Sequence, residues 1–423
     1  MIIFAEKFAK MTVKRLKFGS RLRGTLTPPA SKSLSNRALI LAALTGGRVE
    51  LRNLSEADDT RVLQAALLSH ERTVDIGAAG TAMRFLTAYF AAAGSRGGQE
   101  RLLTGSARMQ QRPIGILVDA LRSLGAHIDY AGAEGFPPLL IEGCELRGDA
   151  LTMPANVSSQ YISALLLIAP TLPRGLRLTL DGEVASRPYI DMTLGLLRRF
   201  GARADWTSPQ TLEIMPEFLD GFAVFEVESD WSAASYWYEM MALSDDADAC
   251  LRLRGLQADS LQGDCAVSRY FERLGVQTRF EEGAAVLTKT ALPAADAPLK
   301  WDLAATPDLA QTLAVCCAAL GRAFQLTGLR SLRIKETDRL AALQNELCKI
   351  GAKVEVVGDE ALRFDGRLTG PVPNPSIRTY DDHRMAMAFA PAALRFPGLA
   401  IEEPQVVSKS YPRFWEDLEM FLE

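Results

Sequence analysis

Lysine and arginine residues recur where the sequence predicts that helices begin. They are Lys32, Arg112, Arg187, Lys335, Arg384 and Lys409. A cation at a helix start opposes the helix dipole by about 0.3 to 1 kcal/mol unless an anion lies between them. Because the chain has a formal net charge of -4, we expect these cations to converge on a strongly negative ligand, such as one that carries both phosphate and carboxylate.

Acidic residues and a histidine stand beside several of these cations. Asp308 lies at a predicted helix start, Glu336 directly follows Lys335, and His383 directly precedes Arg384. Carboxylates and imidazoles can take or give a proton in a transfer reaction, and neighbouring cations shift their pKa. For each motif taken singly a structural role stays open, because acids in a first helical turn and capping serines are ordinary helix chemistry.

Small polar residues mark further helix starts. Ser31 or Ser33 can cap the helix predicted in SKSLSNRALILAAL, and Arg37 lies on the same face as Ser33. Gly80, in VDIGAAGTAMR, lets a ligand approach the backbone while the amides after it point at an anion. Other hydroxyl or amide side chains at such positions are Ser158, Ser159, Gln160 and Ser186.

An internal repeat accounts for the helix starts. An amphipathic helix, a glycine and a short alternating strand return roughly every 75 residues, at Gly125, Gly201, Gly275 and Gly351. Six such units fit the chain, and each carries a second helix. Since a single core stops growing near about 250 to 300 residues, we predict an α/β fold of two similar lobes, each with three units.

The bulk composition excludes several classes of protein. With 48% hydrophobic and 23% charged residues the chain is globular, and its net negative charge gives no field that would hold nucleic acid or an anionic membrane. We find no signal peptide and no apolar run of transmembrane length, so we expect a cytoplasmic protein. The cysteines lack zinc-like spacing and no nucleotide-binding loop occurs, so the residues predict neither a zinc site nor a nucleotide cofactor.

Nine motifs resemble the EPSP synthase family of enolpyruvyl transferases. In chain order they are SKSLSNR, AGTAMR, RMQQRPIG, VSSQY, SRPYIDMTL, PDLAQT, RIKETDR, DDHRMAM and SKSYP. The resemblance implies an inside-out α/β barrel of two lobes, each with three βαβαββ repeats. It further implies a shikimate 3-phosphate-side lobe at 31–228 and a discontinuous second lobe at 1–30 and 229–423. Because the stretch from Ser69 to Thr73 is shorter than in the family, we expect a shortened first repeat.

The resemblance also implies a reaction. The enolpyruvyl group of phosphoenolpyruvate would pass to the 5-hydroxyl of shikimate 3-phosphate by addition and elimination, which gives 5-enolpyruvylshikimate 3-phosphate and inorganic phosphate. This step belongs to chorismate and aromatic amino-acid biosynthesis. The resemblance implies neither a metal nor an organic cofactor, and we expect a monomer that binds these two small molecules.

Site residues carry over from the family by motif. For shikimate 3-phosphate they are Lys32, Ser33, Arg37, Ser158, Ser159, Gln160, Ser186, Tyr189, Asp308, Ser331 and Lys335. For phosphoenolpyruvate they are Lys32, Gly80, Arg84, Arg112, Gln160, Arg339, Arg384 and Lys409. The resemblance makes Asp308 the base on the 5-hydroxyl and Glu336 the carboxyl that exchanges the proton at carbon, with Lys32, Lys409 and His383 assisting.

Three positions depart from the family pattern, and two alternative functions remain. Ala78 and Ser331 stand where asparagine is usual and Phe85 where proline is usual, so the sequence does not predict the response to glyphosate. A UDP-N-acetylglucosamine enolpyruvyl transferase typically has a reactive cysteine in a loop, whereas no cysteine lies between Leu102 and Ala120. A non-catalytic anion-binding paralogue would not need Asp308, Glu336 and Lys32 together.

Overall fold

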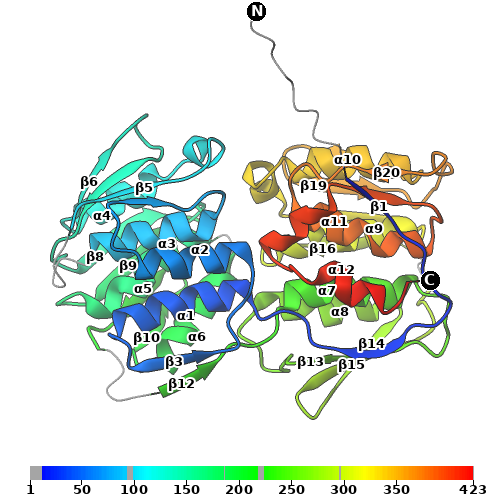
Figure 1. Cartoon of the computed structure of the whole chain (residues 1–423), viewed down its shortest axis with the longest axis horizontal. Helices are drawn as coiled ribbons and strands as arrows, with labels where there is room; N and C mark the ends of the chain where they lie inside the picture. The colour runs from blue at the N-terminus through cyan, green and yellow to red at the C-terminus, as the bar shows by residue number, and fades with distance from the viewer. Residues whose placement is uncertain (1–11, 93–98, 185, 218–222, 295–296, 423) are drawn as a thin grey trace, which may run out of the picture.

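Two separate hydrophobic cores divide the molecule. The computed structural model of this 423-residue chain describes residues 12–92, 99–184, 186–217, 223–294 and 297–422. One core draws its residues from between Ala30 and Val227. The other uses Leu16, Leu22 and Leu26 together with residues between Trp231 and Phe421. Figure 1 shows the two resulting lobes side by side, with the later part of the chain, from green to red, in the second lobe.

Four sheets share one topology. In one of them, β8 (Asp149–Pro154) pairs in parallel with β9 (Leu176–Asp181), and β9 pairs antiparallel with β11 (Thr211–Ile214), which pairs antiparallel with β10 (Ala204–Ser208). The helices α5 (Ser159–Ile168) and α6 (Arg187–Arg199) connect these strands, so the unit reads βαβαββ. The elements of the second such unit are β4 (Thr73–Asp75), α3 (Gly80–Ala91), β5 (Arg101–Thr104), α4 (Gly115–Ser123), β6 (His127–Tyr130) and β7 (Leu139–Glu142).

The other two four-stranded units lie in the second lobe. One contains β2 (Arg23–Leu26), α7 (Trp231–Leu243), β13 (Cys250–Arg254), α8 (Val267–Glu272), β14 (Val276–Glu281) and β15 (Ala284–Lys289). The next contains β16 (Leu299–Asp302), α9 (Ala310–Ala319), β17 (Phe324–Thr327), α10 (Arg339–Lys349), β18 (Glu355–Val357) and β19 (Ala361–Phe364).

The two remaining units have smaller sheets. In the first lobe, α1 (Lys32–Leu44) and α2 (Asp58–Leu68) accompany a two-stranded parallel sheet of β3 (Val49–Arg52) and β12 (Ala223–Glu226). The predicted shortening of the first repeat is therefore confirmed. In the second lobe, α11 (His383–Phe389) and α12 (Phe414–Glu419) accompany three strands, β1 (Val13–Arg15), β20 (Ser376–Ile377) and β21 (Ala400–Glu402).

Helices rather than sheets fill the centre of the second lobe. Every residue of α9 and α11 is buried, and in α7 all but Ser232 are buried. Apolar residues lie on all sides of these helices because other elements surround them, and the few polar residues, such as His383 and Arg384 of α11, are buried as well. The outer helices such as α10 bury only one face, which gives the amphipathic pattern seen in the sequence.

The repeat glycines end the outer helices. Gly125, Gly201, Gly275 and Gly351 have φ values of 102°, 84°, 80° and 88°, a backbone region that favours glycine. The amide after three of them bonds back to a carbonyl of the last helical turn, for example Ala352 N to Leu347 O at 3.0 Å. The roughly 75-residue period therefore corresponds to a recurring helix stop before a strand.

The chain crosses between the lobes twice, and the two crossings lie together. Ser31 N donates to Glu228 O and Asp230 N donates to Pro29 O, both at 2.8 Å. We propose that the lobe boundaries fall at these crossings, as the sequence suggested.

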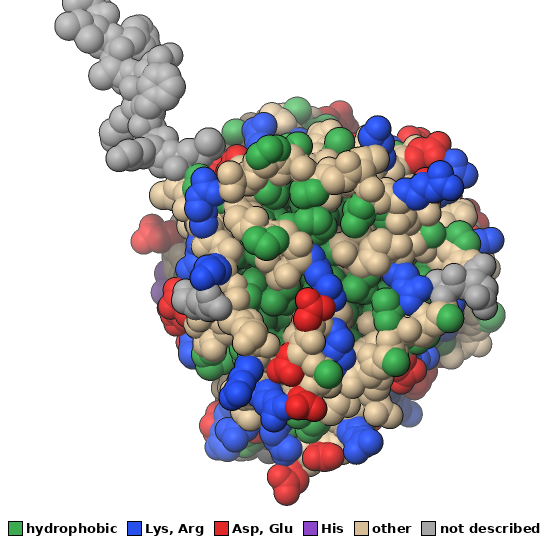
Figure 2. Space-filling view, turned by 90° about the vertical axis from the view of Figure 1, so that its right-hand side faces the viewer, with side chains coloured by type: hydrophobic (Ala, Val, Ile, Leu, Met, Phe, Trp, Pro, Cys, Tyr) green, Lys and Arg blue, Asp and Glu red, His purple; other side chains and the backbone are tan. Residues whose placement is uncertain are grey.

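On the face in Figure 2, basic and acidic side chains are interspersed among apolar ones. None of the described helices is long and apolar enough to cross a membrane.

Candidate active site

Asp308 lies among cations from three elements. It belongs to the 3-10 turn η5 (Pro307–Leu309) that leads into α9. Its Oδ2 is 2.8 Å from Arg384 Nη2, and its Oδ1 is 3.2 Å from Arg339 Nη1 and 3.9 Å from Lys335 Nζ. Burial acts to raise the pKa of Asp308, but Arg384, Lys335 and Arg339 outweigh it and hold the pKa below its ordinary value. Asp308 is therefore ionised at neutral pH.

Glu336 is the second carboxylate of the cluster, which also contains Asp308, Lys335, Arg339, Arg384 and Lys409. Its Oε1 is 2.8 Å from Lys409 Nζ and its Oε2 is 3.0 Å from Arg339 Nη2. Burial acts to raise its pKa, but Arg339 and Lys409 lower the pKa well below the ordinary value. The two carboxylates thus share Arg339 as a common partner.

Arg339 is held by a third carboxylate, to which the sequence assigned no role. It is the first residue of α10 and is 2% exposed. Its Nε lies 2.7 Å and its Nη2 3.4 Å from the carboxylate of Asp382. Asp382 is itself the N-cap of α11 and accepts the Arg384 amide at 2.9 Å. Its position directly before His383 and Arg384 at a predicted helix start was the signal in the sequence.

Lys32 enters the cluster from the first lobe. It opens α1, whose N-cap Ser31 accepts the Leu34 amide. Lys32 Nζ donates to Asp59 Oδ2 at 3.2 Å, and its backbone amide donates to Asp230 Oδ2 at 3.3 Å. Burial acts to lower the pKa of Lys32, but the carboxylates of Asp59, Glu336 and Asp308 together outweigh this and the pKa is raised. Asp59 and Asp230 are site residues that the sequence did not single out.

His383 is buried beside these cations. Neither ring nitrogen has a hydrogen-bond partner among the described residues. Burial lowers the pKa of His383 well below its ordinary value, and Lys32 and Arg384 lower it further. The imidazole is therefore neutral at pH 7.

A second group of predicted residues surrounds the start of α3. A methyl group added at Gly80 would lie 2.5 Å from Arg112 Nη1, so a side chain there would displace that guanidinium. Arg84 Nη1 donates to Gly80 O at 3.0 Å, and Gln160 Nε2 donates to Thr81 Oγ1 at 3.2 Å. Burial lowers the pKa of Arg84 to about 10, Arg112 contributes to the lowering, and Glu336 opposes it. The group therefore borders the Glu336 cluster.

Arg37 is buried, and among the described residues it has no carboxylate partner. It donates to Thr193 Oγ1 at 2.8 Å, Ser33 O at 3.0 Å and Ser163 Oγ at 3.1 Å. Burial lowers its pKa to about 10. A buried cation whose partners are neutral would be stabilised by an anionic ligand.

Two predicted residues at the start of α6 reach across to the second lobe. Tyr189 OH donates to Asp308 Oδ2 at 3.3 Å, and Ser186 Oγ donates to Ala304 O at 3.3 Å. Ser158 caps α5, Ser159 is its first residue, and Ser331 lies half-buried in η6 (Arg330–Ile334). Asp264, absent from the sequence-based set, lies in a small cavity with Ser33 and Tyr189; burial, assisted by Asp308, raises its pKa to about 7.

One expected cation lies apart from the others. Arg187 stacks over the Trp206 ring at 4.0 Å and lies 3.8 Å from Asp191 Oδ2. The prediction that all six helix-start cations converge is therefore wrong for Arg187. Trp206, from β10, supplies an aromatic face, and Asp191, one turn further along the same helix, supplies a charge.

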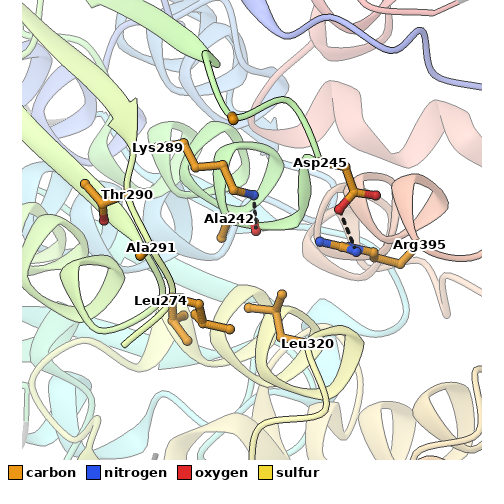
Figure 3. A pocket seen from close by; sticks show the side chains of 10 residues that line it. Ala242, Asp245, Leu274, Lys289, Thr290, Ala291, Leu320 and Arg395 are labelled. Carbon is orange, nitrogen blue, oxygen red and sulfur yellow. Dashed lines mark hydrogen bonds and ion pairs between the residues drawn. The ribbon is translucent and has the colours of Figure 1, made fainter. Parts of the chain in front are cut away.

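A separate cavity of about 390 Å³ lies at the carboxyl end of α7 (Figure 3). Its two cations already have protein partners. Lys289 Nζ donates to Ala242 O at 3.2 Å, and Arg395 Nη1 lies 2.9 Å from Asp245 Oδ1. The carboxylates and cations with shifted pKa values around Asp308 therefore mark the stronger candidate for chemistry.

Comparison with known proteins identifies the family. The family model described as EPSP synthase (3-phosphoshikimate 1-carboxyvinyltransferase) matches residues 16–69 and 64–418. The chain belongs to the EPSP synthase family. Among curated members of the EPSP synthase family, a 3-phosphoshikimate 1-carboxyvinyltransferase of Bacteroides fragilis (strain YCH46) is 52% identical over 399 residues, covering 94% of this chain and 95% of that protein. One from Sulfurovum sp. (strain NBC37-1) is 36% identical over 438 residues, covering 97% and 98%.

Solved structures show the same fold. An EPSP synthase from Acinetobacter baumannii matches with a TM-score of 0.74 at 21% identity, covering 97% of this chain and 98% of that one. The enolpyruvyl transferase NikO from Streptomyces tendae matches with a TM-score of 0.70 at 18% identity, covering 97% of each. The predicted two-lobe enolpyruvyl transferase fold is confirmed.

Proposed function

We propose that this chain is a 3-phosphoshikimate 1-carboxyvinyltransferase, which moves the enolpyruvyl group of phosphoenolpyruvate to the 5-hydroxyl of shikimate 3-phosphate and releases phosphate. One observation carries the proposal at the site. Arg339, Arg384, Lys335 and Lys409 surround two ionised carboxylates, Asp308 and Glu336, and Lys32 from the first lobe influences both electrostatically. Such a cluster suits two polyanionic substrates and a proton transfer.

Substrate binding would change the proton affinity of the two carboxylates. In the free protein, Arg384, Arg339 and Lys409 hold the pKa values of Asp308 and Glu336 low. Substrate phosphate and carboxylate groups would share these cations and so weaken that effect. The pKa of each carboxylate would then rise toward the range useful for catalysis. Asp308 would accept the proton of the 5-hydroxyl, and Glu336 would carry a proton to the methylene carbon.

The remaining expected ligands divide between the two substrates. Arg37 and Tyr189 lie at the wall of the first lobe near Asp308 and suit shikimate 3-phosphate, together with Ser33, Ser158, Ser159, Ser186, Ser331 and Lys335. Arg112 and Gln160 adjoin Gly80 and Thr81 at the start of α3 and suit phosphoenolpyruvate, together with Arg84, Arg339, Arg384 and Lys409. His383, neutral and buried, would accept or relay a hydrogen bond rather than act as a cation.

We further propose that the protein acts as a monomer in the cytoplasm. All six cysteines are free, which fits a reducing compartment.

The test is phosphate release by the purified protein. With phosphoenolpyruvate and shikimate 3-phosphate together we expect turnover, and with either one alone we expect none. UDP-N-acetylglucosamine as the acceptor should give no release. Release with that acceptor, or no release with shikimate 3-phosphate, would contradict the proposal.

A further inference from the structure

A hydrogen bond joins the two lobes beside the cluster. Ser408 Oγ, in the 3-10 segment η8 (Pro404–Lys409) of the second lobe, donates to Asp58 Oδ2 at 2.6 Å. Asp58 is the first residue of α2 in the first lobe. The elements α2 and η8 are in contact. Residues 350 positions apart thus meet where the lobes face each other.

The residues next to this bond belong to the cluster itself. Asp59 accepts from Lys32 Nζ at 3.2 Å in the first lobe. Lys409 Nζ lies 2.8 Å from Glu336 Oε1 in the second lobe. Because consecutive helical residues point in different directions, Asp58 reaches the other lobe while Asp59 reaches Lys32. The Ser408–Asp58 bond therefore connects two ion pairs that face the same site.

Each partner sits on a segment anchored to its own lobe. In η8, buried Val407 accepts the amides of Ser410 and Tyr411 at 3.1 and 2.8 Å, and Trp415 Nε1 donates to Pro404 O at 2.7 Å. In α2, Leu63 is buried in the first core. Since both segments are held by their own lobes, the bond depends on how the lobes sit relative to each other.

We propose that Ser408 and Asp58 form a latch that stabilises the lobe arrangement in which Lys409 and Lys32 share one site. Ser408 and Asp58 are then positioning residues for phosphoenolpyruvate. This inference rests on the proposed function. Neither side chain is placed among the reacting groups. Loss of the latch lowers the population of the binding-competent arrangement, and apparent affinity falls by the same factor. For a partly exposed hydrogen bond to a carboxylate, we expect a factor of about three to ten.

A double-mutant cycle tests the latch. Ser408→Ala and Asp58→Ala should each raise the KM for phosphoenolpyruvate about threefold to tenfold, with kcat within about twofold of the unmutated protein. The KM of the double variant should be no higher than that of either single variant. Ser408→Thr, which keeps the hydroxyl, should restore the KM. Ser410→Ala is the matched control, because among the described residues the Ser410 side chain has no hydrogen bond to the first lobe, and it should leave both constants unchanged.

Solution scattering of the free protein gives a second measurement that needs no activity. The Ser408→Ala protein should be less compact than the unmutated protein, and Ser410→Ala should match the latter. Additive effects in the cycle, an equal effect of Ser410→Ala, or identical scattering of unmutated and Ser408→Ala proteins would overturn the latch. Absence of phosphate release by the unmutated protein would instead overturn the proposed function, and the scattering comparison would still decide the latch.

Discussion

At the scale of single residues, the site is a set of charges that stabilise one another. Asp308 and Glu336 are buried, which by itself disfavours their ionised form, yet each lies within 3.2 Å of two of the cations Arg339, Arg384 and Lys409. Removing one member leaves its partners buried and uncompensated. Isosteric substitutions are therefore the most informative probes of the site.

Replacing Asp308 by asparagine removes the proposed base and keeps the shape of the side chain. We expect kcat to fall about 10² to 10⁴-fold, with smaller changes in KM, as for the loss of a general base. Steady-state phosphate release measures both constants. Asp245→Asn, at an exposed carboxylate paired with Arg395, is the control and should retain full turnover. A kcat for Asp308→Asn within tenfold of the original would remove Asp308 from that role.

His383 makes the protein sensitive to acid. Its pKa in the folded state is depressed by burial and by Lys32, whereas in the unfolded chain it titrates near about 6.5. Below that pH the unfolded state binds the proton and the folded state does not, so the free energy of unfolding decreases as the pH falls. We expect His383→Gln to show a smaller loss in urea midpoint between pH 7.5 and pH 5.5 than the unmutated protein.

The exposed His70 provides the comparison for His383. His70→Gln should leave the pH dependence of the urea midpoint as it is in the unmutated protein. An identical pH dependence in all three proteins would show that His383 does not link folding to protonation.

At the scale of elements, helix ends do most of the positioning. Lys32, Arg339 and Arg384 each lie at or next to the first residue of a helix. Asp382 and Ser31 cap two of these helices with their side chains. The opposite ends of the outer helices stop at glycines whose positive φ permits the turn into the next strand. A fault in such a stop would displace a whole unit.

Two glycines of one unit separate the cost of backbone conformation from that of steric overlap. Gly358 has a φ of 60° with nothing within 4 Å of an added methyl group, whereas at Gly351, with a φ of 88°, the methyl would lie 2.6 Å from Gly370 O. We expect Gly358→Ala to cost about 1 kcal/mol. Gly351→Ala should cost at least about twice as much. Urea unfolding followed by tryptophan fluorescence compares them, and equal costs would show that the backbone at Gly370 yields freely.

At the scale of the whole molecule, two cores joined by two crossings predict two unfolding steps. Trp231, Trp237 and Trp301 are buried in the second core and Trp415 packs against it, while Trp206 packs against the first. Tryptophan fluorescence therefore reports mainly the second lobe, whereas far-ultraviolet circular dichroism reports the helices of both. We expect the urea transitions of the two probes not to coincide. Coincident transitions would mean that the lobes unfold as one cooperative unit.

Much of the fold could be read from local patterns. The amphipathic helices and the glycines that end them depend on residues close together in the chain, so the six units were predictable. The shortened first repeat followed from the resemblance to the family. The helix starts that carry Lys32, Asp308 and Arg384 followed from the same signals. The family resemblance then grouped these residues before any geometry was known.

The tertiary structure alone decided which charges meet. Asp59 with Lys32, Asp382 with Arg339 and Asp58 with Ser408 are partners separated by 27, 43 and 350 positions. Arg187 begins a helix as the other cations do, yet it lies on Trp206 instead. Helix starts reflect local backbone chemistry, but ion pairing and pKa depend on distance and burial, which only the packing of distant elements sets.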